Sequence, residues 1–447
     1  MTVREQVHLA VRLPGTEPAA GTGPRAGTGP RVGAGPQAGA GIDFAAYERL
    51  ARTAECGLFD FLLLAEEARP GGYPEPGHEA DAGSGDEERP AGRPEPLTVL
   101  NALATVTERL GLAAAADTGC HEPYGLAREL ATLDHLSAGR AAWHVIAPAG
   151  DRTGREDIPG ARSAEFVAAA RALWDSWTPD GVPRPFAHRG RYFDIAGEFT
   201  VPRCPQGRPV VLRTGDSPEG RESAAAVADV VLTRHGAPEC GRELRAGLAE
   251  RLRTHGRAPG DVLVMPDAVC VLGETAAEAR ERAAEIRRGQ VSPRQAIRAL
   301  ERVWGTDLSS YDPDGPLPDI DPVPDIGPLP DGGRVPGTRP GDPLAVAGAW
   351  RDLARQKGLS VRETVIEATG RHFFTGTPET VAAAIEESVR AGAADGFVLV
   401  PHPDPGGLAE FVDRVVPLLQ ERGAFRTAYT GPTLRSHLGL SDLVWNG

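Results

Sequence analysis

Eight short apolar runs alternate with helical stretches along the chain, and this alternation restricts the fold more than any other feature. The runs cover residues 7–11, 59–65, 112–116, 141–146, 210–212, 230–232, 262–272 and 397–400. Continuous apolar strands are typical of a parallel sheet that is buried on both faces. Eight strand–helix units therefore predict an α/β fold of the (β/α)8 TIM-barrel type. An open, doubly wound sheet is the alternative, which the number of units disfavours.

The helical stretches fall between these runs, as a barrel requires. They cover residues 45–54, 97–109, 126–136, 166–177, 378–391 and 407–421. Leu97, Leu100 and Leu103 recur at the spacing of one helix face. Pro378 suits the first position of a helix, where no N–H is needed. Barrels with insertions reach this length, so we expect residues 1–447 to form a single domain.

Low-complexity segments interrupt the pattern. Residues 14–41 repeat Gly, Pro, Ala and Thr, and residues 68–94 are similar with added acids. Neither composition can build a core, so we expect both segments to be disordered loops. Residues 311–345 are rich in Pro, Asp and Gly, and we expect them to run extended over a surface.

The charge and the cysteines limit the partners and the compartment. Acidic residues outnumber basic ones, 62 to 48, and the net charge is −14. This balance argues against nucleic acid or an anionic membrane as the main partner. The five cysteines are widely spaced and form no Cys-x-x-Cys pair, which argues against a disulfide framework or a zinc site. No signal peptide or membrane-length apolar run is visible, so we expect a soluble, cytoplasmic protein.

Polar residues follow the predicted strands at the rim where a barrel carries its site. The fifth strand runs into a turn, Gly215 to Gly220, whose free N–H groups and Ser217 hydroxyl could hold an anion. Other polar residues of this rim are Glu66, Glu67, Asp117, Thr118, His121, His144, His235 and His402. We expect these side chains to converge on one site.

Each of these residues also has a structural interpretation, which stays open at this point. Ser217 can be an ordinary helix N-cap, and His144 can be a hydrogen-bonded interior histidine. His121 and His402 can be exposed loop residues, and Glu66 with its acidic neighbours can be solvated charge. No His-x-His or His-Glu-x-x-His spacing occurs, so we expect no metal site.

Several ordered segments resemble one known family. They include Leu-Asp-His-Leu-Ser-Ala-Gly-Arg at 133–140, Arg-Ala-Leu-Trp-Asp-Ser-Trp at 171–177, and residues 95–111, 202–222 and 425–440. The chain is similar to the flavin-dependent monooxygenases of the bacterial-luciferase superfamily, in the branch of nitrilotriacetate monooxygenase. The matching segments run from about residue 42 to 440 with gaps.

The resemblance implies both an architecture and a reaction. It implies a barrel with an insertion, here residues 273–375, before the last strand. It implies reduced FMN (FMNH2) that is supplied by a separate NADH:flavin oxidoreductase, and a homo-oligomer. Reaction of the flavin with O2 at C4a then gives a hydroperoxide that oxygenates a small organic substrate. Apolar barrel walls would protect such an adduct from water.

The resemblance also assigns individual residues. It implies that Gly215 and Ser217 bind the flavin phosphate, and that Asp117 and Thr118 lie where relatives carry a hydroxyl pair. Glu66 stands at the position of an aspartate and His144 at that of an asparagine. His144 and His121 are the expected catalytic residues. The candidate flavin-binding set is therefore Glu66, Asp117, Thr118, His144, Gly215 and Ser217.

Two segments depart from the family pattern. The loop after the fourth strand is short, and Glu156 and Gly160 fall where relatives carry a flavin-contacting His and Tyr. Residues 14–41 replace a His- and Trp-rich segment. The shortened loop leaves open a divergent, non-catalytic binding or partner protein. The resemblance also leaves open a deazaflavin-dependent oxidoreductase, because the barrel of this superfamily hosts that cofactor too.

Overall fold

The computed structural model describes residues 6–13, 43–64, 94–147, 160–234, 238–323, 343–369, 372–401 and 407–443. The expected disordered loops, 14–41 and 68–94, lie outside these ranges except for residue 94. So do Glu66, Glu67, Glu156, His235 and His402. Part of the expected extended segment, residues 324–342, also lies outside them.

Eight parallel strands close into a barrel. In order around it they are β1 His8–Leu13, β2 Phe61–Leu64, β3 Gly111–Asp117, β4 Ala141–Ile146, β7 Val210–Thr214, β8 Val230–Thr233, β9 Leu263–Leu272 and β11 Gly396–Leu399. β11 pairs with β9 on one side and with β1 on the other, which completes the ring. The predicted TIM barrel and its eight strands are confirmed, and the open sheet is excluded.

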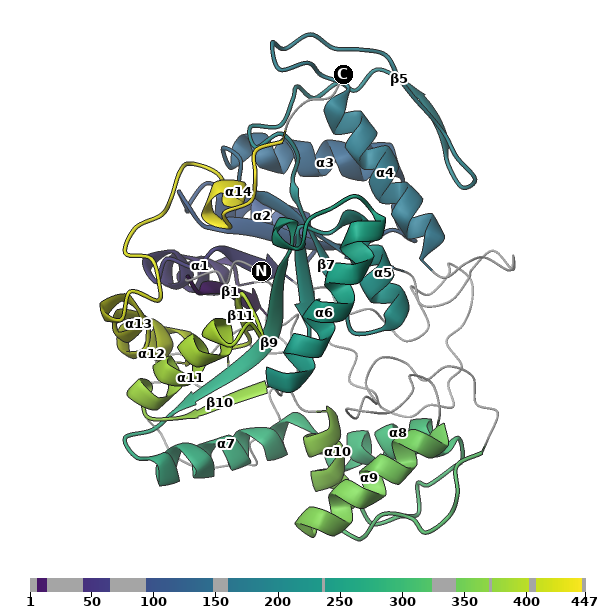
Figure 1. Ribbon diagram of the computed structural model, residues 1–447, viewed down its shortest axis with the longest axis vertical. Coiled ribbons are helices and arrows are strands. Elements are labelled where there is room, and N and C mark those ends of the chain that lie inside the picture. The colour runs from purple at the N-terminus through teal and green to yellow at the C-terminus, as the bar shows by residue number, and fades with distance from the viewer. Residues whose placement is uncertain are drawn as a thin grey trace.

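Helices cover the outside of the ring (Figure 1). They are α1 Phe44–Cys56, α2 Pro96–Ala104, α3 Pro123–Leu136, α4 Ala161–Asp175, α5 Pro218–Val227, α6 Pro238–Thr254, α11 Pro378–Arg390, α12 Gly407–Arg414 and α13 Val416–Glu421. The larger core lies between strands and helices and contains Leu9 and Val11 of β1. A second core fills the barrel and contains Ala10 of the same strand.

The helix expected over 126–136 begins three residues earlier, at Pro123, and larger differences occur at three other expected helices. The helix expected over 97–109 ends at Ala104, because the carboxylate of Glu55 accepts the backbone N–H groups of residues 108–110 in place of helical carbonyls. The helix expected over 166–177 already begins at Ala161. The one expected over 407–421 is divided at Val415, next to Pro417, which has no N–H to donate.

The expected insertion, residues 273–375, contains helices and most of a strand that were not predicted from the sequence. They are α7 Ala276–Gln290, α8 Pro293–Trp304, α9 Pro343–Lys357, α10 Val361–Thr369 and β10 His372–Gly376. The α8, α9 and α10 helices form a separate group in Figure 1, around a small core with Trp304 and Trp350. β10 pairs with the outer half of β9, from Ala268 to Leu272, as a ninth strand outside the ring.

A hairpin between α4 and β7 was also not predicted. Its strands are β5 Phe186–Arg189 and β6 Asp194–Gly197, which pair antiparallel. Glu165 of α4 holds its turn, because its carboxylate accepts the backbone N–H groups of Arg191, Tyr192 and Phe193. The strands are only four residues long, too short for a strong period-two pattern.

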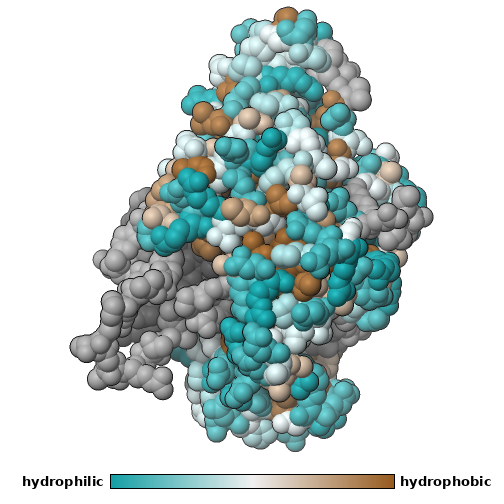
Figure 2. Space-filling view, turned by 90° about the vertical axis from the view of Figure 1, so that its left-hand side faces the viewer, coloured by the Kyte–Doolittle hydropathy of each residue, from teal (hydrophilic) through white to brown (hydrophobic). Residues whose placement is uncertain are grey.

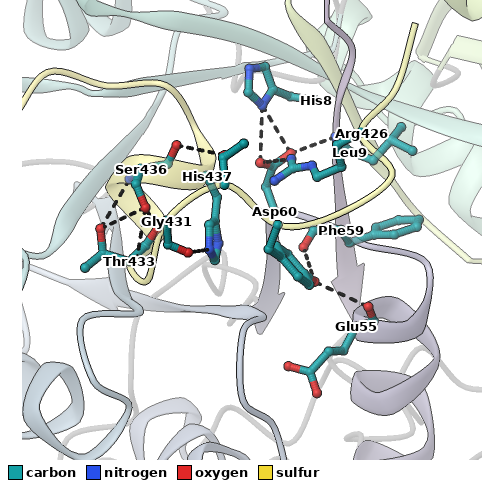
Figure 3. A network of polar contacts seen from close by, with 12 residues as sticks. His8, Leu9, Glu55, Phe59, Asp60, Arg426, Gly431, Thr433, Ser436 and His437 are labelled. Carbon is teal, nitrogen blue, oxygen red and sulfur yellow. Dashed lines mark hydrogen bonds and ion pairs between the residues drawn. The ribbon is translucent and has the colours of Figure 1, made fainter. Parts of the chain in front are cut away.

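The C-terminal segment closes the amino end of the barrel. Leu434 of α14 (Leu434–His437) and Leu438 belong to the inner core. Beside them, Arg426 forms an ion pair with Asp60, which is fully buried and also lies 3.2 Å from His8 Nδ1 (Figure 3). The carboxyl end is therefore the end at which a ligand could enter.

The outer surface shown in Figure 2 is mostly hydrophilic, with hydrophobic residues in small groups. Among the described helices, none combines the length and apolar character needed to cross a membrane.

Candidate functional site

The carboxyl mouth of the barrel carries a layer of inward-facing polar side chains. Ala10, Ala142, Leu212, Leu232 and Met265 all belong to the core inside the barrel. Side chains two positions apart on a strand share a face. The next inward positions are therefore held by Arg12, His144, Thr214, Arg234 and Asp267.

His144 and Thr214 form one polar pair in this layer. The imidazole Nε2 lies 3.2 Å from the Thr214 hydroxyl oxygen. His144 is only 4% exposed, and its Nδ1 has no hydrogen-bond partner among the described residues. Burial, together with the positive charges of Arg12, Arg213 and Arg234, lowers the pKa of His144 to about 3. His144 is therefore a neutral imidazole at pH 7, with one buried nitrogen unused.

Arg12 and Asp267 form a second polar pair. Nη2 of Arg12 donates to Oδ1 of Asp267 at 3.0 Å, across the intervening strand β11. Asp267 is 1% exposed, whereas Arg12 is partly exposed. The Nε atom of Arg12 is buried and has no partner among the described residues.

The two pairs stand on opposite walls of the mouth. Around the ring, β8 separates β7 from β9 on one side, and β2 and β3 separate β4 from β1 on the other. The floor between the pairs is apolar and includes Leu63, Leu232, Met265 and Val398. A planar molecule that enters this mouth would have polar groups on two sides and a dry floor beneath it.

The turn after β7 has the expected tight geometry. A Cβ on Gly215 would lie 2.5 Å from Val231 Cγ1, and one on Gly220 would lie 2.8 Å from the Thr214 carbonyl oxygen. Ser217 is the N-cap of α5, and its Oγ accepts the N–H of Gly220 at 2.9 Å. The N-cap interpretation is confirmed, and the helix already begins at Pro218, inside the turn expected over Gly215 to Gly220. Ser217 is half-buried, and its hydroxyl proton can still be donated to an anion.

A buried cation lies behind this turn. Arg213 donates to Ser163 Oγ at 2.9 Å, near the start of α4. Gly160 caps that helix with φ +83°, and α4 has no side-chain cap. Burial lowers the pKa of Arg213 to about 10, so the group stays positively charged at pH 7. Arg213, the start of α4 without a side-chain cap and the Ser217 hydroxyl are thus suited to an anion.

The turn after β3 uses its polar groups locally. Oδ1 of Asp117 accepts the N–H of Gly119 at 2.7 Å, and His121 Nδ1 lies 2.9 Å from the Asp117 carbonyl oxygen. Thr118 is fully buried, and its hydroxyl lies 3.3 Å from the carbonyl oxygen of Ile146 on β4. Within the described chain, no contact joins His121 to His144.

The structure therefore brings together only some of the expected residues. His144 faces into the mouth, and Gly215 and Ser217 form the corner beside it, whereas Asp117, Thr118 and His121 hold the neighbouring turn. Glu66 lies outside the described residues. Two polar residues of the mouth, Arg12 and Asp267, were not singled out from the sequence, whereas Thr214 belongs to the polar run Arg213 to Ser217 that follows the fifth predicted strand. No group of three or more potential metal ligands occurs in the described ranges.

Comparison with known proteins shows what this chain is similar to. The family model described as luciferase-like monooxygenase matches residues 27–395. N-acetyl-S-(2-succino)cysteine monooxygenase of Bacillus subtilis (strain 168) is 33% identical over 425 residues, which cover 89% of this chain and 90% of the relative. Nitrilotriacetate monooxygenase component A of Aminobacter aminovorans is 34% identical over 428 residues, with 89% and 90% coverage.

Solved structures of related proteins superpose on this chain. The EDTA monooxygenase of Chelativorans sp. BNC1 superposes with a TM-score of 0.69 at 29% identity, covering 90% of this chain and 92% of that one. A coenzyme F420-dependent tetrahydromethanopterin reductase from Methanopyrus kandleri superposes with a TM-score of 0.54 at 15% identity, covering 92% and 99%. The second likeness shows the barrel alone.

Proposed function

The chain belongs to the luciferase-like monooxygenase family, and we propose that the mouth of its barrel holds reduced FMN beside a small organic substrate. The resemblance inferred from the sequence, including the nitrilotriacetate monooxygenase branch, is confirmed. The protein is a flavin-dependent monooxygenase, the oxygenase component of a two-component system that uses FMNH2 from a flavin reductase. This identity favours catalysis over a purely binding role, and FMN over a deazaflavin.

The corner after β7 is suited to the phosphate of FMN. Ser217 offers a hydroxyl at the start of α5, and the buried guanidinium of Arg213 supplies positive charge behind it. The α4 helix begins nearby without a side-chain cap. Together these groups would neutralise and bind a phosphate dianion. This placement keeps Gly215 and Ser217 as cofactor-binding residues.

The ring of the flavin would then lie over the apolar floor, with His144 at its edge. The unpaired Nδ1 of His144 is the observation that carries this placement, because a buried polar atom without a partner is costly until a ligand satisfies it. Bound FMNH2 supplies the electrons that activate O2. His144 contributes a neutral hydrogen bond, and Leu63, Leu232 and Met265 exclude water.

The remaining expected residues keep narrower roles in this proposal. Asp117 and Thr118 shape the wall beside β4, and His121 is the second catalytic candidate, on the partly exposed turn. Glu66 stays a candidate for the rim after β2. We further propose one domain for residues 1–447, a homo-oligomer, NADH as the reductant of the partner reductase, and a cytoplasmic location, which five free cysteines favour.

The test is an anaerobic titration of the full-length protein with FMNH2, followed by addition of O2. We expect saturable binding of FMNH2 and slower consumption of the bound flavin's reducing equivalents by O2 than in free solution. A protein that neither binds FMNH2 nor alters its reaction with O2 would refute the proposed site.

A further inference from the structure

We propose that Arg12 is a binding residue for a carboxylate group of the organic substrate, and that Asp267 positions its guanidinium. This inference rests on the proposed function, because it assumes that the flavin occupies the same mouth. It adds Arg12 and Asp267 to that site, and it names small organic carboxylates as the substrate class.

The first argument is the geometry of the ion pair. Among the described residues, Asp267 accepts one side-chain hydrogen bond, from Nη2 of Arg12, at 3.0 Å. A guanidinium has five N–H donors in a planar fork that fits a carboxylate with two parallel bonds. Within the described chain Asp267 is the only hydrogen-bond acceptor of Arg12, and Nε is buried without one. The pair therefore leaves donors for a second carboxylate.

The second argument is its place in the barrel. Most neighbouring inward positions below it are apolar, including Ala10, Leu63, Met265 and Val398. A buried ion pair is weak evidence for stability, because desolvation offsets most of the attraction. Its position at the open end of the barrel therefore points to a ligand rather than to the core.

The third argument is the distribution of charge. The whole chain has a net charge of −14. Nevertheless Arg12, Arg213 and Arg234 all place positive charge near His144. The phosphate proposed for the β7–α5 corner would pair with Arg213, on the opposite wall from Arg12. Arg12 and Arg234 are then the cations left for an anionic group on the substrate side, and of the two Arg12 has a buried Nε without a partner among the described residues. A charged, apolar-walled mouth concentrates such ligands.

The experiment measures binding of two small probes to full-length protein loaded anaerobically with FMNH2. Succinate carries two carboxylates, and succinamide is its uncharged analogue of nearly equal size. We expect calorimetry to detect succinate, and to show at least about tenfold weaker binding of succinamide, the factor that a charge-assisted hydrogen bond supplies. Arg12→Gln should lose a similar factor for succinate, and Arg12→Lys should lose less.

The matched control is Arg245→Gln. Arg245 also pairs with a buried aspartate, Asp395, at 2.8 Å, but that pair lies at the amino end of β11. This variant should bind succinate like the wild type. Asp267→Asn, which keeps the guanidinium, should weaken succinate binding less than Arg12→Gln and provides a second variant if Arg12→Gln does not fold.

Three results would overturn the inference. The first is that the wild type binds no succinate up to about 10 mM, a limit that corresponds to very weak affinity. The second is equal binding of succinate and succinamide, and the third is unchanged succinate binding in Arg12→Gln. Loss of FMNH2 affinity in Arg12→Gln without loss of succinate binding would make Arg12 a flavin ligand instead. The affinity of the wild type for FMNH2 is measured separately, and failure to bind it would refute the proposed function.

Discussion

The imidazole of His144 meets the hydroxyl of Thr214 at 3.2 Å across two neighbouring strands, β4 and β7. This contact occupies Nε2, whereas the other ring nitrogen, Nδ1, is buried and has no hydrogen-bond partner among the described residues. The pair thus orients one unused hydrogen-bonding atom within the carboxyl mouth.

Replacing His144 by Leu should weaken FMNH2 binding about three- to tenfold, which corresponds to one neutral hydrogen bond. His144→Asn should retain most of the affinity, because an amide can still bond at this position. Flavin fluorescence or calorimetry under anaerobic conditions measures both. Thr214→Val is the control for the supporting contact and should have the smaller effect. Equal affinity in His144→Leu and the wild type would place the ring elsewhere.

The pH dependence of turnover tests the charge state of His144. Because burial and the nearby arginines lower its pKa to about 3, its protonation does not change between pH 6 and 8. We expect the kcat profiles of the wild type and His144→Asn to have the same shape over that range. An inflection near pH 6.5 that disappears in the variant would show that His144 titrates during turnover.

Ser217→Ala should weaken FMNH2 binding about tenfold, the loss expected for one hydrogen bond to a charged group. The fold offers a close control, because Ser292 is also an N-cap serine followed by proline, at the start of α8 in the insertion. Both substitutions remove a cap worth about 1 kcal/mol, so their melting temperatures should fall similarly. Only Ser217→Ala should change flavin affinity, and an equal affinity in both variants would move the phosphate away from this corner.

Asp60→Asn should destabilise the fold strongly without altering the mouth. Burial raises the pKa of Asp60, but Arg426 and His8 lower it further, so the net pKa lies below the usual value and the group is charged at pH 7. Removing that charge leaves Arg426 buried and unpaired, at a cost of about 3–5 kcal/mol. Urea unfolding measures this loss. Glu48→Gln, which breaks the exposed pair with Arg52 at 2.9 Å, should cost less than about 1 kcal/mol.

His437 should make the protein sensitive to mild acid. Burial and Arg426 lower its pKa from 6.5 to about 4. Between these values the unfolded chain binds a proton that the folded chain does not, so this contribution to stability falls as pH falls. The free-energy difference between the wild type and His437→Gln should shift by about 1.4 kcal/mol per pH unit over that interval. Urea unfolding at several pH values measures it, and a constant difference would contradict it.

The barrel could be predicted because the sequence patterns that indicate its strands and helices each lie within a short stretch of the chain. Each of the eight strands is a short apolar run, and the parallel arrangement follows from helices between them. The β5–β6 hairpin and β10 could not be found in this way. The hairpin strands are short and partly exposed, and β10 is defined only by its pairing with the far half of β9.

The candidate site was predicted in part. The glycines around Ser217 indicated a tight turn, and the structure shows the close approaches that require them. Thr118 looked equivalent to Ser217 as a rim hydroxyl, yet it is fully buried against Ile146. Burial of a single hydroxyl depends on how two neighbouring strands meet, which no local pattern encodes.

By itself, the amino-acid sequence determined the strand order, the class of barrel, the family and the tight corner after β7, because each depends on residues close together in the chain. Only the tertiary structure placed Arg12 against Asp267, 255 residues away, and set this pair opposite His144 and Thr214. The closure of a ring decides which distant side chains face the same cavity, and this depends on strand register rather than on the identity of any one residue.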